Sequence, residues 1–124
     1  MTRLTNIAIH HPGPSVEIGF EWDEVIRYNE TVLWSLFARD QRDQTRQFGY
    51  KLIGDKPVQF VFNHNRGLQS NTPVSASLGF REGYLRVRFP LWSATGMDLA
   101  ALVHTHGNLN IDGHDVSQRQ LLSP

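Results

Sequence analysis

The stretch WDEVIRYNETVLWSLFARDQRDQ, residues 22–44, decides the predicted fold of this chain of 124 residues. Its apolar residues recur in pairs at positions 25/26, 32/33 and 36/37, a spacing typical of one face of a helix. No glycine or proline interrupts the stretch, acidic residues open it, and Arg39 and Arg42 lie near its end, as the helix dipole favours. We therefore predict one principal helix over about residues 22–46.

Other segments of the chain carry the period of two that is typical of strands. In KPVQFVFNH, for example, Val58, Phe60 and Phe62 alternate with residues of the opposite face. Strands are expected over residues 5–11, 15–20, 50–54, 56–64, 74–80, 84–92 and 100–106, and a loop over 65–73. The predicted fold class is α+β: a mixed or mainly antiparallel sheet with the principal helix packed on it, in a single domain over residues 1–124.

Charge and cysteine content narrow the classes of function. Lys plus Arg and Asp plus Glu both number 12, so the net charge is zero, and we expect neither nucleic acid nor an anionic membrane as the partner. The chain has no cysteine, which excludes a disulfide framework and a thiolate zinc site. No apolar run approaches the length that crosses a bilayer, and the first residues lack the features of a secretory signal, so a soluble, cytoplasmic protein is expected.

The segment ALVHTHGNLNIDGHDVS, residues 101–117, carries the candidate metal ligands. His104 and His106 are two residues apart on a predicted strand, so both imidazoles project from the same face. Asp115 follows nine residues later, where we expect a helical turn, and offers a carboxylate oxygen as a third ligand. Two histidines, one carboxylate and a water are the open ligand set of a catalytic Zn²⁺ ion, which would activate its water for hydrolysis.

The order of these residues resembles that of the JAMM metallopeptidases, also called MPN+. The segment VHTHG, residues 103–107, is similar to the strand and histidine pair of that family, and DGHDVS, residues 112–117, is similar to its S-x-x-D segment. The resemblance implies that His104, His106 and Asp115 hold zinc and that the substrate is a peptide or isopeptide. It covers about 95 residues, of which a dozen are specific.

The chain departs from the family pattern at two catalytic positions. Asp112 stands where the family has a serine that assists the oxyanion, and a carboxylate would repel the developing negative charge. Gln47 falls where the family has its general-base glutamate, and a glutamine cannot accept a proton. Glu17, in the segment VEIGF, is the other candidate for the base. Asp112 and Glu17 are therefore the candidate catalytic residues, in a site that we expect to be impaired.

Two further interpretations stay open. A small neutral domain with exposed aromatic residues and no general base fits a non-enzymatic protein–protein interaction module, such as an inhibitor, an adaptor or an immunity-type protein. A histidine pair followed by an acid also occurs in cupin-like metal enzymes, but these require an all-β structure, and the predicted helix counts against it. In the peptidase and module interpretations the expected partner is a peptide or a protein.

Overall fold

The chain folds into β-strands joined by short connections. The computed structural model describes residues 2–10, 14–27 and 30–121. The strands are β1 (Leu4–His10), β2 (Ser15–Trp22), β3 (Thr31–Asp40), β4 (Thr45–Ile53), β5 (Lys56–Asn63), β6 (Leu68–Asn71), β7 (Ala76–Gly79), β8 (Tyr84–Pro90), β9 (Leu102–Ile111) and β10 (His114–Leu121). Within the described ranges, helical structure is confined to the 3₁₀ turns η1 (Leu91–Ala94) and η2 (Leu99–Ala101).

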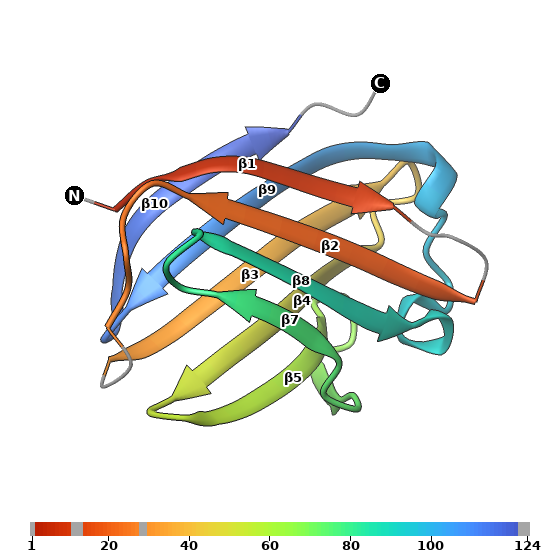
Figure 1. Ribbon diagram of the computed structural model, residues 1–124. Coiled ribbons are helices and arrows are strands. Elements are labelled where there is room, and N and C mark those ends of the chain that lie inside the picture. Colours follow the sequence, from red (N-terminus) through yellow and green to blue (C-terminus); the bar gives the residue numbers. More distant parts are fainter. Residues whose placement is uncertain (1, 11–13, 28–29, 122–124) are drawn as a thin grey trace.

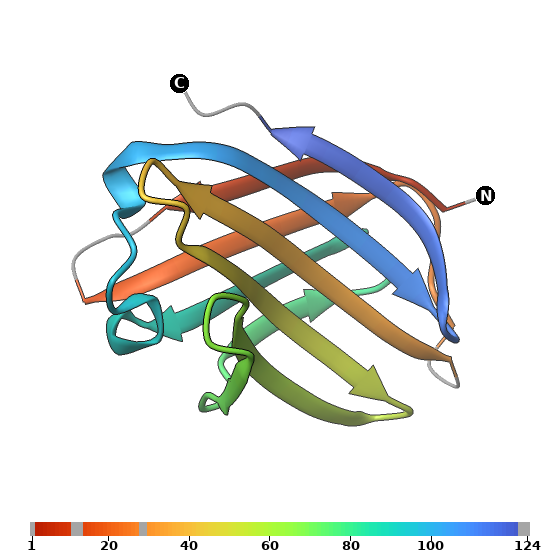
Figure 2. The ribbon, with the colours of Figure 1, turned by 180° about the vertical axis from the view of Figure 1, so that it is seen from behind.

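The strands form two antiparallel sheets that pack face to face as a β-sandwich (Figure 1). One sheet has four strands in the order β1-β2-β8-β7, and the other has six in the order β10-β9-β3-β4-β5-β6. Seen from behind, the six-stranded sheet covers most of the molecule (Figure 2). The edge strands β1 and β10 come together where the Leu4 backbone N–H donates to Ser117 Oγ at 2.9 Å.

The predicted helix over 22–46 is wrong, because residues 31–40 form β3 and residues 45–53 form β4. The residues of β3 that face the interior of the sandwich are Val32, Trp34, Leu36, Ala38 and Asp40. The alternate residues Leu33 and Phe37 are half-buried on the other face, so apolar residues fall next to each other. A strand with two apolar faces thus reproduces the paired spacing of a helix. Residues 28–29 of the predicted helix lie outside the described residues.

The fold class is therefore all-β rather than α+β, while most of the predicted strands are confirmed. Strands β2, β5 and β8 and the β7–β8 hairpin lie where they were predicted. The strand expected over 100–106 is also present, as β9, which begins at Leu102 and continues to Ile111. The expected loop at 65–73 contains the short strand β6, and the helical turn expected at Asp115 is part of β10.

The core lies between the two sheets and is rich in aromatic side chains. The Trp34 ring is fully buried, with its centroid 5.2 Å from that of Trp22 and 6.2 Å from those of Tyr50 and Phe80. This packing fixes which face of each strand points inward, because a shift of register by one residue would expose the whole apolar set. The remaining faces of both sheets point to solvent. No helix in the described part of the chain has the length and apolar character to span a membrane.

Candidate functional site

The outer face of the six-stranded sheet carries a row of side chains that crosses all six strands. The strand register places one residue from each strand in line, in the order Gln120, His106, Phe37, Gln47, Phe62 and Gln69. We call these six residues the transverse row, and the face that bears them the ring face. All six belong to the face opposite the core, and each is at least partly exposed.

Five rings on the ring face contact one another in a continuous series. The Phe62 centroid lies 4.7 Å from that of His64, which lies 5.7 Å from that of Phe37. Phe37 stacks on His106, with centroids 4.8 Å apart and planes at 10°, and His106 meets His104 edge-on at 5.5 Å. Ring pairs with centroids about 4.5–7 Å apart are in contact. The five rings therefore form one ordered surface.

Two hollows meet on the ring face at the histidine pair. One has a volume of about 430 Å³ and is lined by Phe37, Ala38, Arg39, Thr45, His64, Asn65, His104 and His106. The other, of about 420 Å³, is lined by His104, His106, Gln118 and Gln120. Each volume is in the range that holds a small ligand or one unit of a larger one.

Hydrogen bonds from neighbouring turns fix the backbone of His64, whose ring lies between those of Phe62 and Phe37. The His64 backbone N–H donates to the Thr45 carbonyl at 3.1 Å. The Asn65 side chain accepts from the Thr45 N–H at 2.7 Å and donates to the Asp43 carbonyl at 2.9 Å. Because these bonds join the β5–β6 turn to the β3–β4 turn, the wall of the first hollow is built on fixed backbone.

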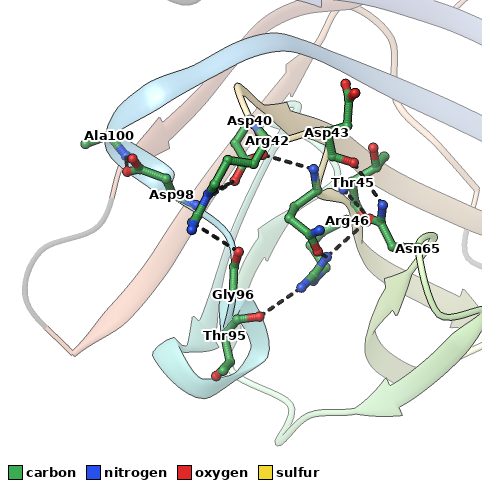
Figure 3. A network of polar contacts seen from close by, with 11 residues as sticks. Asp40, Arg42, Asp43, Thr45, Arg46, Asn65, Thr95, Gly96, Asp98 and Ala100 are labelled. Carbon is green, nitrogen blue, oxygen red and sulfur yellow. Dashed lines mark hydrogen bonds and ion pairs between the residues drawn. The ribbon is translucent and has the colours of Figure 1, made fainter.

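A buried carboxylate holds the β3–β4 turn in place (Figure 3). The Asp40 side chain is fully buried and accepts backbone N–H bonds from Arg42 and Gln44 at 2.9 Å and from Asp98 at 2.8 Å. Burial raises the pKa of this carboxyl, but the three N–H donors and the Arg42 charge outweigh burial, so the pKa lies below its ordinary value. Asp40 therefore stays ionised and ties the turn to the loop that follows η1.

A second buried charge reinforces the same corner. The Arg46 guanidinium donates to the Thr95 carbonyl at 2.8 Å and to the Thr45 carbonyl at 3.3 Å, with the side chain almost wholly buried. Burial lowers the pKa of this group, while the nearby Asp40 charge raises it. The corner thus contains a buried cation and a buried anion that fix the ends of β3 and β4.

The histidine pair keeps the geometry predicted for it, since His104 and His106 share one face of β9. Burial and then the neighbouring His104 lower the pKa of His106. A neutral imidazole is the form that binds a metal ion. The pair could supply two ligands to one ion, with the rest of the coordination shell coming from water or a partner.

The structure does not bring Asp115 to the histidine pair. Asp115 pairs in register with Asn110, which is four residues from His106 along β9, or about 13 Å. The carboxylate accepts from the side chains of Asn108 and Asn110 at 3.0 Å, and these two bonds lower the pKa of Asp115. Among the described residues, no group of three His, Asp or Glu side chains converges on a possible metal position. Two of the three predicted zinc ligands, His104 and His106, lie together, and the third, Asp115, does not. Zinc binding therefore stays a prediction.

The two predicted catalytic carboxylates lie apart from the pair. Asp112 is in the β9–β10 turn, where its side chain accepts from the Thr31 N–H at 2.8 Å. Glu17 lies on β2, in the other sheet, and forms an ion pair with Arg88 at 3.1 Å. Gln47 is on the ring face between Phe37 and Phe62. Of these three residues, Gln47 is the one that lies in the same transverse row as His106. Gln47 is the residue predicted to stand in place of the general-base glutamate.

The all-β structure meets the condition set for a cupin-like enzyme, but that interpretation also needs an acid beside the histidines. Asp115 is not beside them, as the register shows. Sequence reasoning missed the ring-face residues Phe37, Phe62 and Gln47 as a functional set. Their alternation in 56–64 was visible, but their alignment depends on pairing between distant strands.

No family model matches the chain, and no curated protein matches it in sequence. Function is therefore inferred from the geometry of the ring face.

Proposed function

We propose that this chain is a non-enzymatic binding module whose ligand or partner lies on the ring face. The observation that supports this proposal is the transverse row, in which the rings of His106, Phe37 and Phe62 lie close together on an outer sheet face. Exposed clusters of apolar side chains mark interaction sites, whereas polar side chains are sufficient for a face that only contacts water. Clustered, ordered aromatic side chains with interspersed polar groups are typical of binding surfaces.

The arrangement of polar groups favours binding over hydrolysis. The carboxylates that could act as general acid or base are engaged elsewhere, Asp115 by two asparagines and Glu17 by Arg88 on the other sheet. General acid–base catalysis needs such a group within hydrogen-bond reach of the reacting atoms. Gln47, which takes a central place on the ring face, can donate and accept hydrogen bonds but cannot take a proton.

The experiment measures retention of the purified chain on immobilised polysaccharides, peptides and nucleic acids. We expect one class to retain the chain, and the double variant Phe37→Ala/Phe62→Ala to lose retention by at least about tenfold. Tyr84→Ala removes a ring from the outer face of the other sheet and is the matched control, which should bind normally. Equal retention of all three proteins, or retention by no class, would overturn the proposal.

The zinc peptidase stays a separate hypothesis, supported by the shared face of His104 and His106. Its test is metal analysis of protein purified without an affinity tag. One zinc ion per chain in the wild type, lost in His104→Ala/His106→Ala, together with hydrolysis of a peptide or isopeptide substrate, would favour it over the binding module.

A further inference from the structure

The transverse row combines two kinds of chemical group. Its rings are His106, Phe37 and Phe62, and its amides, Gln120, Gln47 and Gln69, stand between the phenyl rings and at both ends. An amide group both donates and accepts hydrogen bonds, as a hydroxyl group does. An aromatic ring offers an apolar surface that C–H groups contact favourably. A ligand that presents both C–H groups and hydroxyl groups along its length would match this combination.

The row is uncharged, which argues against anionic and cationic ligands. Among the described residues, the neighbouring row that contains His104 has one charged side chain, that of Arg39, which pairs with His104 in register. Binding of nucleic acid or an acidic polymer depends on several cationic side chains, because each neutralised charge releases a counterion. One arginine beside the row does not meet that requirement.

The composition of the row also differs from that of a protein interface. Protein interfaces are enriched in the aromatic residues Trp, Tyr and Phe and in Met and Arg, and their fully buried centre is depleted in charged groups and largely apolar. The transverse row shares the aromatic enrichment through Phe37 and Phe62, but it contains no Met or Arg, and half of it consists of amides. A ligand rich in hydroxyl groups would satisfy those amides, whereas an apolar protein surface would leave them without hydrogen bonds.

The spacing of the rings suits a chain of linked units. Phe37 and Phe62 lie on β3 and β5, two strands apart, which corresponds to about 9.5 Å. His106 lies on the other side of Phe37, on β9. In a linear chain of pyranose rings, consecutive units lie end to end at a spacing between that of adjacent strands and that of alternate strands. Such a chain can therefore contact successive rings of the row.

We infer that the ligand of the ring face is a neutral, linear oligosaccharide that lies across the strands along the transverse row. Its C–H groups contact the rings of Phe37, Phe62 and His106, and its hydroxyl groups exchange hydrogen bonds with the glutamines between and beside them. The inference rests on the proposed function and names the ligand class of the same face.

The test is calorimetric titration of the full chain with defined probes. The neutral probes are a soluble mixed-linkage β-glucan, xylan, galactomannan and soluble starch, and the anionic probes are polygalacturonate and heparin. We expect one neutral probe to bind, with an affinity unchanged between low and high salt, because no ion pair forms. Phe37→Ala and Phe62→Ala should weaken binding about tenfold each, and Gln47→Leu about fivefold.

Thermal melting and the Tyr84→Ala control separate loss of binding from loss of folding. Phe37→Leu, which keeps an apolar side chain but removes the ring, is used where Phe37→Ala melts early. Binding of only an anionic probe, weakened by salt, would overturn the inference, as would a neutral probe that binds all variants alike. Retention of peptides by the ring face without any glycan binding would overturn the inference and leave the binding module standing. Binding of no probe class would overturn both.

Discussion

The two outer faces of the sandwich are built on the same strand geometry but carry different chemistry. The face of the four-stranded sheet is charged: Glu17 forms an ion pair with Arg88, and the Arg86 guanidinium lies 5.1 Å from the centre of the Tyr84 ring. The ring face has rings and amides in the corresponding central positions. Either set keeps a sheet face compatible with water, so solvation alone does not explain the rings.

The side chains of the ring face are held by more contacts than the ion pair of the charged face. On the charged face, the Arg88 side chain is 59% exposed and its ion pair is open to solvent. Exposed pairs of this kind contribute about 0–1 kcal/mol. On the ring face, Phe37 is stacked on His106, and His64 is fixed through backbone bonds to Thr45. Preorganised side chains cost less entropy on binding, which is the reason to look for a ligand there.

The largest expected effect comes from breaking the support beneath the ring face. The Asp40 carboxylate accepts one backbone N–H bond each from Arg42, Gln44 and Asp98. Asp40→Asn keeps the shape of the side chain but replaces one of the two acceptor oxygens with an NH₂ group, which is a donor. We expect the free energy of unfolding to fall by about 2–4 kcal/mol, because buried donors lose a charged acceptor. Urea denaturation followed by tryptophan fluorescence measures the change.

The control for Asp40 is Arg42→Ala, since the Arg42 side chain is 66% exposed and lies 3.9 Å from the carboxylate. It should cost less than about 1 kcal/mol. Because the folded pKa of Asp40 is lowered, its stabilisation should also be lost as the pH falls below the ordinary carboxyl value. A larger cost for Arg42→Ala than for Asp40→Asn would show that the ion pair, not the backbone donors, holds the turn.

The next effect sharpens the comparison with a matched pair of glycines, one on each outer face. A Cβ at Gly49 would lie 2.3 Å from Cζ of Phe60, whereas a Cβ at Gly19 would have Cγ of Arg86 at 4.0 Å as its nearest neighbour. Gly49→Ala should therefore destabilise the protein by about 1–3 kcal/mol, through displacement of the Phe60 ring. Gly19→Ala should change the free energy of unfolding by no more than about 0.5 kcal/mol.

Thermal unfolding of the two glycine variants side by side checks this prediction. A tolerated Gly49→Ala, equal in stability to Gly19→Ala, would mean that Phe60 moves outward without cost. The ring face would then be less ordered than its packing indicates.

The third prediction concerns the charge state of the ring face. Burial and the neighbouring His104 lower the pKa of His106. At a pH just below the ordinary histidine pKa of about 6.5, the unfolded chain therefore binds more protons than the folded chain. Stability should therefore decrease as the pH falls through this window towards the folded pKa. NMR titration of the imidazole signals should place His106 below the ordinary value, and His104→Gln should move it upwards by removing the neighbouring charge. No upward movement in His104→Gln would mean that burial alone sets the pKa.

Much of the sheet was predictable from alternation, and the main failure has a local physical cause. In β3, Leu33 and Phe37 are half-buried on the ring face, so periodicity could not separate strand from helix. The β-branched and aromatic residues Thr31, Val32 and Trp34 favoured the strand and were the available signal. One strand with two partly covered faces was enough to change the predicted fold class.

The histidine segment also contained the sequence signal of a β-hairpin, which the metal-site prediction did not take into account. Asp112 and Gly113 have φ angles of 52° and 85°, as the Asp-Gly pair of a two-residue hairpin turn does. The alternation in NLNI and the residues after Gly113 indicated the β9–β10 hairpin, which separates Asp115 from the histidines. The transverse row itself could not be predicted, because its order depends on the pairing of β3 with β9 across more than 60 residues of sequence.

The smallest expected effect tests the charged face and the predicted catalytic role of Glu17 together. Glu17→Gln removes an ion pair whose partner, Arg88, is mostly exposed, so the free energy of unfolding should change by less than about 1 kcal/mol, and by still less in high salt. Binding at the ring face should not change, because β2 belongs to the opposite sheet. A loss of binding as large as that of Phe37→Ala would instead show that the two outer faces are coupled through the core, since no side chain of the charged face lies in the transverse row. Measuring both quantities on one variant therefore decides whether the chemical contrast between the faces is also a division of function.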